Sequence, residues 1–355
     1  MSLKILVFAP HEGDHIYPWL RAQMHQHQLT VLSFHYDKPR TDQVRFIHLK
    51  RFTGTRLDFL LNIPTIFWKL RQINPDLIHV HYLSSYGLIA AFFPKRYPKL
   101  LSIWGSDINK NYNQSVMGRL CRWALGKYQM INSPSEDIKK KLIAWGYPEN
   151  QIATFQYGID FSELALRPEK LPSKGVQFLS PRDWAPLYRI EKIIEGFAHF
   201  AKDDSTAVLH LTGRGGAERK AELQKIIQDL GIGSQVVMHG FMEWEDYVEF
   251  LASCDVIVSI PTMDGMPLSL MEANYIGLYP IVSNVPANQE WLQQGIASFV
   301  QGNDAGEIAQ AMDEAKKRCF DFKELQKNRN LVFKNGDRQK NMKSLSEIYQ
   351  KLAQR

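Results

Sequence analysis

The stretch CDVIVSIPTMDGMPLSLMEANYIG, residues 254–277, joins an apolar run to a turn and then to a segment of helical character. A short apolar run bounded by turn residues is typical of a strand that is buried on both faces of a sheet. Pro267 suits the first position of a helix, because its fixed φ is helical and its missing N–H would have no partner there. The stretch therefore predicts a strand that leads through a tight turn into a helix.

The same order recurs along the whole chain. Ten apolar runs are predicted as buried strands, at residues 4–9, 29–34, 76–82, 99–104, 128–132, 176–180, 207–213, 235–241, 254–260 and 279–284. Stretches with helical periodicity separate them, for example residues 136–145 and 189–201. Strand–helix alternation of this kind indicates the α/β class, with parallel sheets covered by helices on both faces.

The chain length of 355 residues fits two domains. The periodicity breaks in LRPEKLPSKG, where Pro168, Pro172 and Gly175 lie among polar residues. We predict a first Rossmann-like domain at residues 1–165, a linker at 166–175, a second Rossmann-like domain at 176–335 and a final helix at 336–355. Two doubly wound domains facing a central cleft are the expected architecture, with ligands at the carboxyl ends of the strands.

Composition narrows the class of protein. A hydrophobic content of 45% and a charged content of 23% are those of a globular chain. Cys121, Cys254 and Cys319 lie far apart, which argues against a zinc ribbon or a disulfide framework and suits a reducing compartment. The first residues read as a strand rather than an export signal, and the longest apolar runs are too short to span a membrane. We therefore expect a cytoplasmic protein.

Positive charge is concentrated in the first half of the chain. Residues 1–165 carry 20 Lys and Arg against 12 Asp and Glu, whereas the remainder carries 23 against 25. Such a surface could face an anionic membrane or a phosphorylated acceptor, or it could simply be solvated. No helix-turn-helix, zinc-finger or RNA-binding signature accompanies the charge, so nucleic acid is not expected as a partner.

The turn in the opening stretch has the features of an anion site. The N–H groups around Gly265, Met266 and Leu268 are left free at a helix N-terminus, where a diphosphate would fit. Asp264 could accept hydrogen bonds from sugar hydroxyls, and Glu272, about one and a half turns into the helix, could reach a ribose. Alternatively, Asp-Gly is turn chemistry and the glutamate is a solvated helix residue.

Several stretches in sequence order resemble glycosyltransferase family 4, retaining enzymes of the GT-B fold. The opening stretch resembles the E-x7-E region of that family. Other resembling stretches are PDLIHVHY, SIWGSDI, INSPSEDI, FQYGIDFSE, SPRDWAPLYRIEKIIEGF, LHLTGRGG and VVMHGFMEWEDYVEFLASCDVIVSIPT. Together they cover nearly the whole chain.

The resemblance implies a donor site in the second domain. Arg182 matches the phosphate-binding arginine of the family, and Gly213 matches its glycine-rich turn. Asp264 stands where the family usually has glutamate. Tyr188 stands where the family usually has lysine, and we expect Arg189 to supply the missing charge. In GT-B enzymes a C-terminal helix crosses back to the first domain, which is the expected role of residues 336–355.

The resemblance also implies an acceptor site in the first domain. His81 matches the strand-end position of the family, and Trp104 offers an apolar face for a sugar ring. Asp107 could accept a hydroxyl proton, which would make it catalytic, or it could cap the next helix. The loop PHEGDHIYPW, with His11 and Gly13, is expected to line the acceptor side in place of the glycine-rich loop usual in the family.

Two histidine groups allow other interpretations. The cluster of His11, Glu12, Asp14 and His15 faintly echoes the metal-binding loop of zinc-dependent sugar deacetylases, although the adjacent Asp pair of that loop is missing. His79 shares a strand face with His81 but lies deeper, where a hydrogen-bonded core histidine is expected.

The expected reaction is transfer of a sugar from a UDP- or GDP-sugar to a glycan or lipid-linked glycan in cell-surface polysaccharide or glycoconjugate synthesis. The resemblance implies retention by front-face attack, without a metal, a cofactor or a protein nucleophile. Arg182 would stabilise the leaving diphosphate, while Asp264 and Glu272 position the donor. A nucleotide-sugar epimerase and a non-catalytic partner subunit of the same fold are the alternatives.

Aromatic and basic residues interleave in FFPKRYPK, residues 92–99, and in LNIPTIFWKLRQ, residues 61–72. This pattern suits peripheral docking at the inner face of an anionic membrane. The aromatic residues could equally be helix faces packed in the core.

Overall fold

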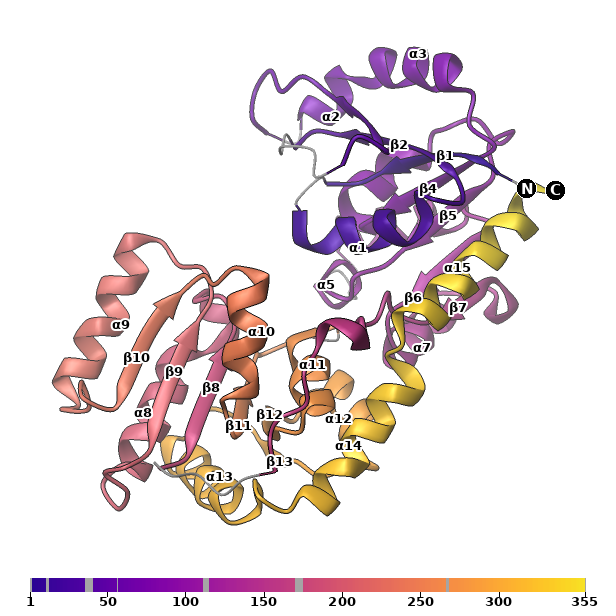
Figure 1. The fold of residues 1–355 in the computed structure, drawn as a ribbon. Helices are drawn as coiled ribbons and strands as arrows, with labels where there is room; N and C mark the ends of the chain where they lie inside the picture. Colours follow the sequence, from indigo (N-terminus) through magenta and orange to yellow (C-terminus); the bar gives the residue numbers. More distant parts are fainter. Residues whose placement is uncertain are drawn as a thin grey trace. The chain divides into compact units, whose positions relative to one another are not determined.

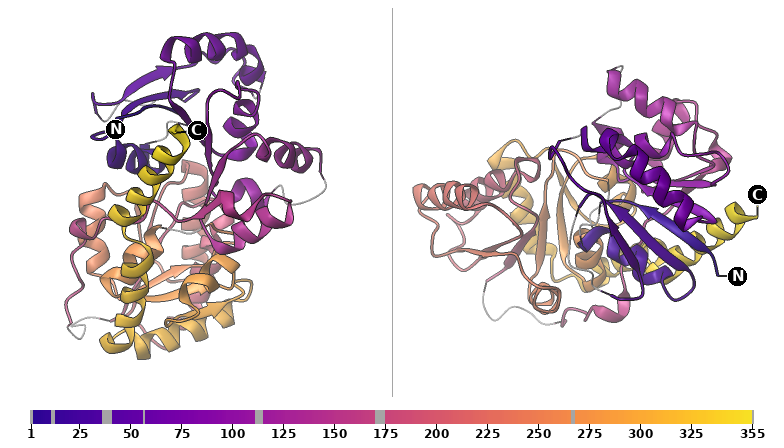
Figure 2. Two further views of the ribbon diagram at one scale, coloured as in Figure 1. Left: turned by 90° about the vertical axis from the view of Figure 1, so that its right-hand side faces the viewer. Right: turned by 90° about the horizontal axis from the view of Figure 1, so that it is seen from above.

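The computed structural model describes residues 2–10, 13–35, 41–55, 57–110, 115–169, 175–265 and 268–354, with the exception of the side chains of 13–15. The chain forms two compact units, Met1–Tyr157 with Arg338–Arg355 and Gly158–Asp337 (Figures 1 and 2). Each unit is a parallel sheet with helices on both faces, so the predicted α/β class and its two doubly wound domains are confirmed.

The sheet of the first unit has the order β3-β2-β1-β4-β5-β6-β7 within the described residues. Its strands are β1 (Lys4–Phe8), β2 (Gln28–Ser33), β3 (Arg45–His48), β4 (Leu77–His81), β5 (Lys99–Ser102), β6 (Met130–Ser133) and β7 (Ile152–Thr154). All neighbouring strands are parallel. The order changes direction between β1 and β4, which is the switch point where doubly wound sheets bind ligands.

Two groups of helices cover the first sheet. The helices are α1 (Gly13–Gln23), α2 (Leu57–Leu61), α3 (Ile63–Ile73), α4 (Leu88–Ala90), α5 (Ser106–Asn109), α6 (Val116–Leu125), α7 (Glu136–Ala144) and α15 (Arg338–Ala353). On one face, Ile78 and Val80 of β4 join a core with residues of α3, α4, α6 and α7. On the other face, His79 bonds to Tyr349 of α15, and Gln23 of α1 donates to the Met342 carbonyl at 2.9 Å. The last helix thus belongs to the first unit.

The sheet of the second unit has the order β10-β9-β8-β11-β12-β13 within the described residues, again with a switch point, between β8 and β11. Its strands are β8 (Gln177–Pro181), β9 (Val208–Thr212), β10 (Val236–Gly240), β11 (Val256–Ser259), β12 (Tyr279–Ser283) and β13 (Ser298–Val300). Its helices are α8 (Ile190–Phe200), α9 (Ala217–Asp229), α10 (Trp244–Ala252), α11 (Leu268–Ile276), α12 (Pro286–Leu292), α13 (Ala305–Arg318) and α14 (Phe322–Asn335).

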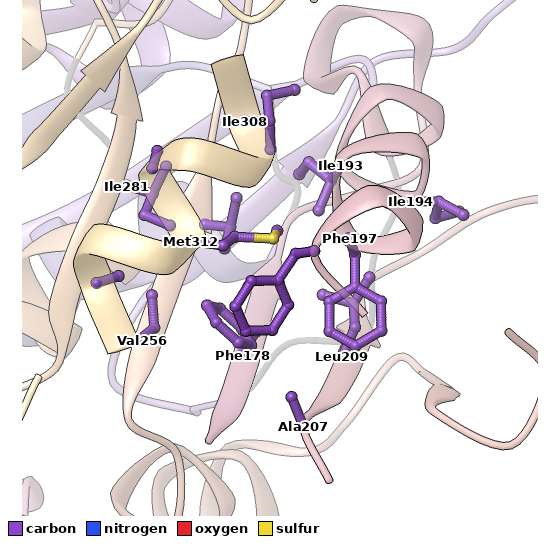
Figure 3. Close-up of a cluster of buried hydrophobic side chains, with 14 of the residues drawn as sticks. Phe178, Ile193, Ile194, Phe197, Ala207, Leu209, Val256, Ile281, Ile308 and Met312 are labelled. Carbon is purple, nitrogen blue, oxygen red and sulfur yellow. The ribbon is translucent and has the colours of Figure 1, made fainter. Parts of the chain in front are cut away.

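Alternate residues of the second sheet enter two different cores. Phe178 of β8 packs with Phe197 of α8 and Met312 of α13 on one face (Figure 3). The next residue, Leu179, joins a core with residues of α10, α11, α12 and α14 on the other face. Burial on both faces explains why the central strands are nearly continuous apolar runs.

The two units divide between Tyr157 and Gly158, not at the predicted linker of residues 166–175. The segment after the division belongs to the second unit, because the Ile159 N–H donates to the Gly336 carbonyl at 2.8 Å. Farther on, Arg167 is buried and forms an ion pair of 2.8 Å with Asp255. Pro168, the next residue, interrupts the periodicity without ending a domain, and Pro172 lies outside the described residues.

No helix among the described residues is long and apolar enough to cross a membrane.

Candidate functional site

Three loops of the second unit leave the carboxyl ends of neighbouring strands. Arg182 follows β8, Gly213 follows β9, and Asp264 lies in the loop after β11. The Arg182 Nη2 donates to Asp264 Oδ2 at 2.7 Å, and the two side chains are only 10% and 13% exposed. The sheet therefore brings three of the predicted donor residues together at its switch point.

Two neighbours position this ion pair. The Arg182 guanidinium carbon lies 4.3 Å from the ring centroid of Tyr188, within cation–π range. The other oxygen of Asp264, Oδ1, accepts the N–H of Gly265 at 2.8 Å. Tyr188, which replaces a cation in the resembling family, therefore supports Arg182 through its ring face.

Gly213 is required by its geometry. Its φ is +122°, a conformation that side chains rarely adopt, and a Cβ placed there would lie 2.3 Å from the Arg182 carbonyl oxygen. The glycine thus allows the β9 loop to pass directly against the backbone of Arg182.

Arg189 has a different environment from Arg182. Its backbone is left-handed, with φ 53°, and its Nη1 donates to the Gln301 carbonyl at 2.6 Å. A Cβ on Gly302 would lie 2.8 Å from the same Nη1. The guanidinium is therefore held by the loop that follows β13.

Glu272 is 5% exposed on α11, and it is not the solvated helix residue of the alternative reading. Tyr247 of α10 lies near it. Burial raises the pKa of Tyr247 well above its usual value, and the charge of Glu272 adds to this shift while that of Arg182 opposes it. Sequence patterns had not indicated Tyr247, whose only signal was its place in a helical repeat.

The predicted helix-start residues are only partly described. Helix α11 begins at Leu268. Met266 and Pro267 lie outside the described residues, so their contribution to an anion site stays a prediction.

In the first unit, the end of β4 contains a buried histidine with one ring nitrogen already occupied. The Trp104 Nε1–H donates to His81 Nδ1 at 3.3 Å. This hydrogen bond leaves Nε2 as the protonated nitrogen of a neutral ring. Burial lowers the pKa of His81 to about 3, so the ring is neutral at pH 7. Among the described residues, the buried Nε2 has no hydrogen-bond partner.

Trp104 has one face covered. Its indole stacks on Tyr82 with ring centroids 5.1 Å apart and planes 6° from parallel. Tyr82 has a φ of 67°, unusual for a tyrosine, at the switch point of the first sheet.

The Asp107 carboxylate accepts hydrogen bonds from the backbone in this structure. It is 3% exposed, and its two carboxylate oxygens accept the N–H groups of Leu83 at 2.9 Å and Trp104 at 3.2 Å. Burial raises its pKa, and these hydrogen bonds oppose the shift. Of the two roles that the sequence left open, these contacts favour the structural one.

His79 is a satisfied core histidine, as expected. Its Nδ1 lies 2.7 Å from the Tyr349 hydroxyl, and its Nε2 lies 2.8 Å from Ser102 Oγ. Both ring nitrogens are therefore occupied.

The metal hypothesis rested on the loop after β1. His11 and Glu12 lie outside the described residues, as do the side chains of residues 13–15, and Gly13 is the first residue of α1. The described residues contain no group of three His, Cys, Asp or Glu side chains that could hold a metal ion.

Two family models match the chain. The model described as "Glycosyl transferases group 1" matches residues 163–330, and "Glycosyl transferase 4-like" matches residues 4–135. Together they cover most of the chain. The chain is therefore a glycosyltransferase of the GT-B type that resembles members of glycosyltransferase family 4.

Known proteins agree with this class. A curated relative, tRNA-queuosine alpha-mannosyltransferase from Drosophila melanogaster, is 20% identical over an alignment of 269 residues, and the match covers 70% of this chain and 68% of that protein. Sucrose-phosphate synthase from Thermosynechococcus elongatus superposes with a TM-score of 0.81 at 17% identity, over 98% of both chains. HepE from Anabaena in complex with UDP-glucose superposes with a TM-score of 0.78 at 13% identity, over 99% of this chain and 100% of that chain. The solved structures show the same fold.

Proposed function

We propose that this glycosyltransferase binds a UDP- or GDP-sugar in its second unit and transfers the sugar with retention of configuration. The Arg182–Asp264 pair at the switch point between β8 and β11 is the observation that carries the proposal. HepE, a structural neighbour, has been solved with UDP and with UDP-glucose, which supports a nucleotide-sugar donor.

Arg182 would stabilise the negative charge that develops on the leaving diphosphate. A guanidinium has five N–H donors in a fixed fork, so contact with Asp264 through Nη2 leaves others for phosphate oxygens. The N–H groups at the start of α11 would add dipoles of the right sign. Arg189 would contribute charge from the start of α8, while its contact with Gln301 fixes its position.

Asp264 and Glu272 would position the donor. Asp264, held by Arg182 and by the Gly265 N–H, has a fixed orientation for accepting sugar hydroxyls. Glu272 would bind the ribose hydroxyls, next to Tyr247. Front-face attack requires no protein nucleophile, and we propose that neither a metal nor a cofactor takes part.

The acceptor would bind to the first unit. The Nε2–H of His81 is a buried donor suited to a sugar hydroxyl, and Trp104 lies directly beside it. Asp107 would act as a positioning residue, because it fixes the backbone of Leu83 and Trp104. His11 and Gly13 would line the same side.

We further propose that the acceptor is a glycan or a lipid-linked glycan of a cell-surface polysaccharide or glycoconjugate. The protein would act at the cytoplasmic face of a membrane, to which its basic first half would bind peripherally. The three cysteines are free and buried, in keeping with a reducing compartment.

Thermal unfolding with a panel of UDP, GDP and their sugars, with and without EDTA, tests the donor site. We expect one diphosphate to raise the Tm by an equal amount in both conditions. The Arg182→Ala variant should lose this shift, whereas Lys225→Ala, which removes an exposed cation of α9, should keep it. A shift that requires a metal would contradict metal independence, and the absence of any shift would favour a non-catalytic subunit.

Product analysis separates the enzyme classes. A retaining transferase forms product only when an acceptor is added, and the new bond keeps the anomeric configuration of the donor. Conversion of the nucleotide sugar without an acceptor would identify an epimerase instead.

A further inference from the structure

Helix α6 exposes apolar side chains on its outer face. Val116, Leu120 and Trp123 are 66%, 44% and 42% exposed, whereas Cys121 and Ala124 on the opposite side are buried. Residues at this spacing share one side of a helix. A surface helix normally presents polar residues to water, so a second apolar stripe needs an explanation.

The exposed apolar surface extends from α6 to the segment that follows α4. Phe92, which is 62% exposed, contacts Trp123 with ring centroids 5.0 Å apart. We call Phe92, Val116, Leu120 and Trp123 the α6 face. The buried Phe93 next in sequence packs in the core, so the FFPKRYPK stretch contains one core aromatic residue and one exposed one.

Lysines border the α6 face. Lys127 Nζ lies 5.3 Å from the ring centroid of Trp123, and Lys95 is exposed. Lys99 is buried and donates to the Phe93 carbonyl at 3.1 Å. Burial, with the neighbouring charges of Lys127 and Lys95, lowers the pKa of Lys99 to about 8, so each of these two lysines lies within electrostatic reach of Lys99.

Acidic side chains do not neutralise this group. Within the described residues, neither Lys95 nor Lys127 forms an ion pair, and the same holds for Arg119 on the exposed side of α6. The result is an exposed apolar surface beside cations that form no ion pair within the part of the chain that the structure describes.

We propose that the α6 face is the membrane-docking surface of the first unit, with Leu120, Trp123 and Phe92 inserted at the bilayer interface and Lys95 and Lys127 against anionic lipid headgroups. This inference deepens the peripheral membrane binding of the proposed function and rests on it. Tryptophan beside lysine is the side-chain pairing that the membrane interface favours.

Two other occupants fit the surface less well. A second copy of the chain would bring like charges of two lysine groups together across a symmetric interface. RNA would use the cations and the Trp123 ring but would leave Val116 and Leu120 exposed to its phosphates. An anionic bilayer offers an apolar region to the apolar side chains and negative headgroups to the lysines.

Sedimentation with vesicles tests the proposal on the full-length chain. At low salt we expect the protein to pellet with phosphatidylcholine–phosphatidylglycerol vesicles and not with phosphatidylcholine alone. Each lysine removed in Lys95→Ala and Lys127→Ala should weaken binding about fivefold. The Leu120→Ser/Trp123→Ser variant should weaken it at least about tenfold.

Matched controls lie on the second unit. Lys220→Ala/Lys225→Ala removes two exposed lysines of α9, and Val237→Ser removes a side chain that is 41% exposed on β10. Both should bind as the wild type does. Equal losses in the controls, or unchanged binding in the α6 variants, would overturn the proposal, as would a dimer or an RNA complex that the same α6 variants disrupt.

Thermal stabilisation by nucleoside diphosphates distinguishes the proposed donor site from the proposed docking surface. If UDP or GDP stabilises the protein but the protein does not bind anionic vesicles, the donor-site proposal is supported and the docking proposal is overturned. Vesicle binding that depends on the α6 face, without nucleotide stabilisation, would support docking and count against the donor site. The α6 variants should keep the nucleotide response, which also shows that they fold.

Discussion

Arg182 and Asp264 lie 82 positions apart in the sequence and form an ion pair of 2.7 Å at the switch point of the second sheet. Their loops follow β8 and β11, two strands that are neighbours although β9 and β10 separate them in the chain. The doubly wound order therefore brings an anion-binding cation and a hydroxyl-binding carboxylate together. Each holds the other in place before a ligand arrives.

Removal of the carboxylate should separate sugar recognition from diphosphate binding. Asp264→Ala frees Arg182 for phosphate oxygens but removes the acceptor for sugar hydroxyls. We expect the transfer rate to fall by about 10²–10³-fold. The nucleoside diphosphate without its sugar should still raise the Tm of the variant. Asp264→Glu restores the residue usual in the resembling family and should keep more activity than the alanine variant. Loss of the diphosphate response in Asp264→Ala would show that the carboxylate is needed to hold Arg182.

A side chain at Gly213 should disturb the fold around Arg182. The Cβ of Gly213→Ala would lie 2.3 Å from a carbonyl oxygen, at a φ of +122°. We expect a loss of about 2–4 kcal/mol in unfolding free energy, together with weaker nucleotide binding. Gly233→Ala is the control, because its Cβ would meet nothing within 4 Å. Equal stability of the two variants in denaturant unfolding would contradict this prediction.

The sequence predicted the central strands and the edge strand β10, but not the other strands at the sheet edges. Central strands such as β4 and β11 are covered on both faces, so their side chains form nearly continuous apolar runs. Three strands among the described residues were not predicted: β3, β7 and β13. All three lie at an edge of their sheet, are short and include partly or fully exposed residues, which weakens the apolar signal.

The candidate site could be predicted only where local sequence carries it. Turn chemistry pointed to Asp264 and Gly265, and the resemblance pointed to Arg182. The contact of Arg182 with Tyr188, and the place of Tyr247 near Glu272, depend on side chains from distant segments. For the same reason the sequence did not reveal that both oxygens of Asp107 accept backbone N–H groups.

The buried ion pair of Arg167 and Asp255 should be essential for the second unit. Arg167 forms an ion pair of 2.8 Å with Asp255 and donates to the Cys319 carbonyl at 3.0 Å. Arg167→Ala leaves a buried carboxylate without its partner and should cost about 3–5 kcal/mol of unfolding free energy. The double variant Arg167→Met/Asp255→Asn removes both charges and should recover part of that loss. Denaturant unfolding of the wild type and the two variants measures the loss and its recovery. An Arg167→Ala variant as stable as the wild type would show that water reaches the pair.

Acid should destabilise the first unit through its buried histidines. The pKa of His81 is lowered to about 3 by burial, against 6.5 for an ordinary histidine, and that of His79 is lowered by burial and by His81. Below pH 6.5 these histidines are therefore protonated in the unfolded chain but stay neutral in the folded chain. The free energy of unfolding falls as the pH falls towards 3. From pH 8 to pH 5, His81 alone should cost about 2 kcal/mol. Urea unfolding of the wild type and of His81→Gln at both values measures this contribution. The variant should lose about that much less stability on acidification, and an identical loss in both proteins would show that His81 is protonated in the folded state.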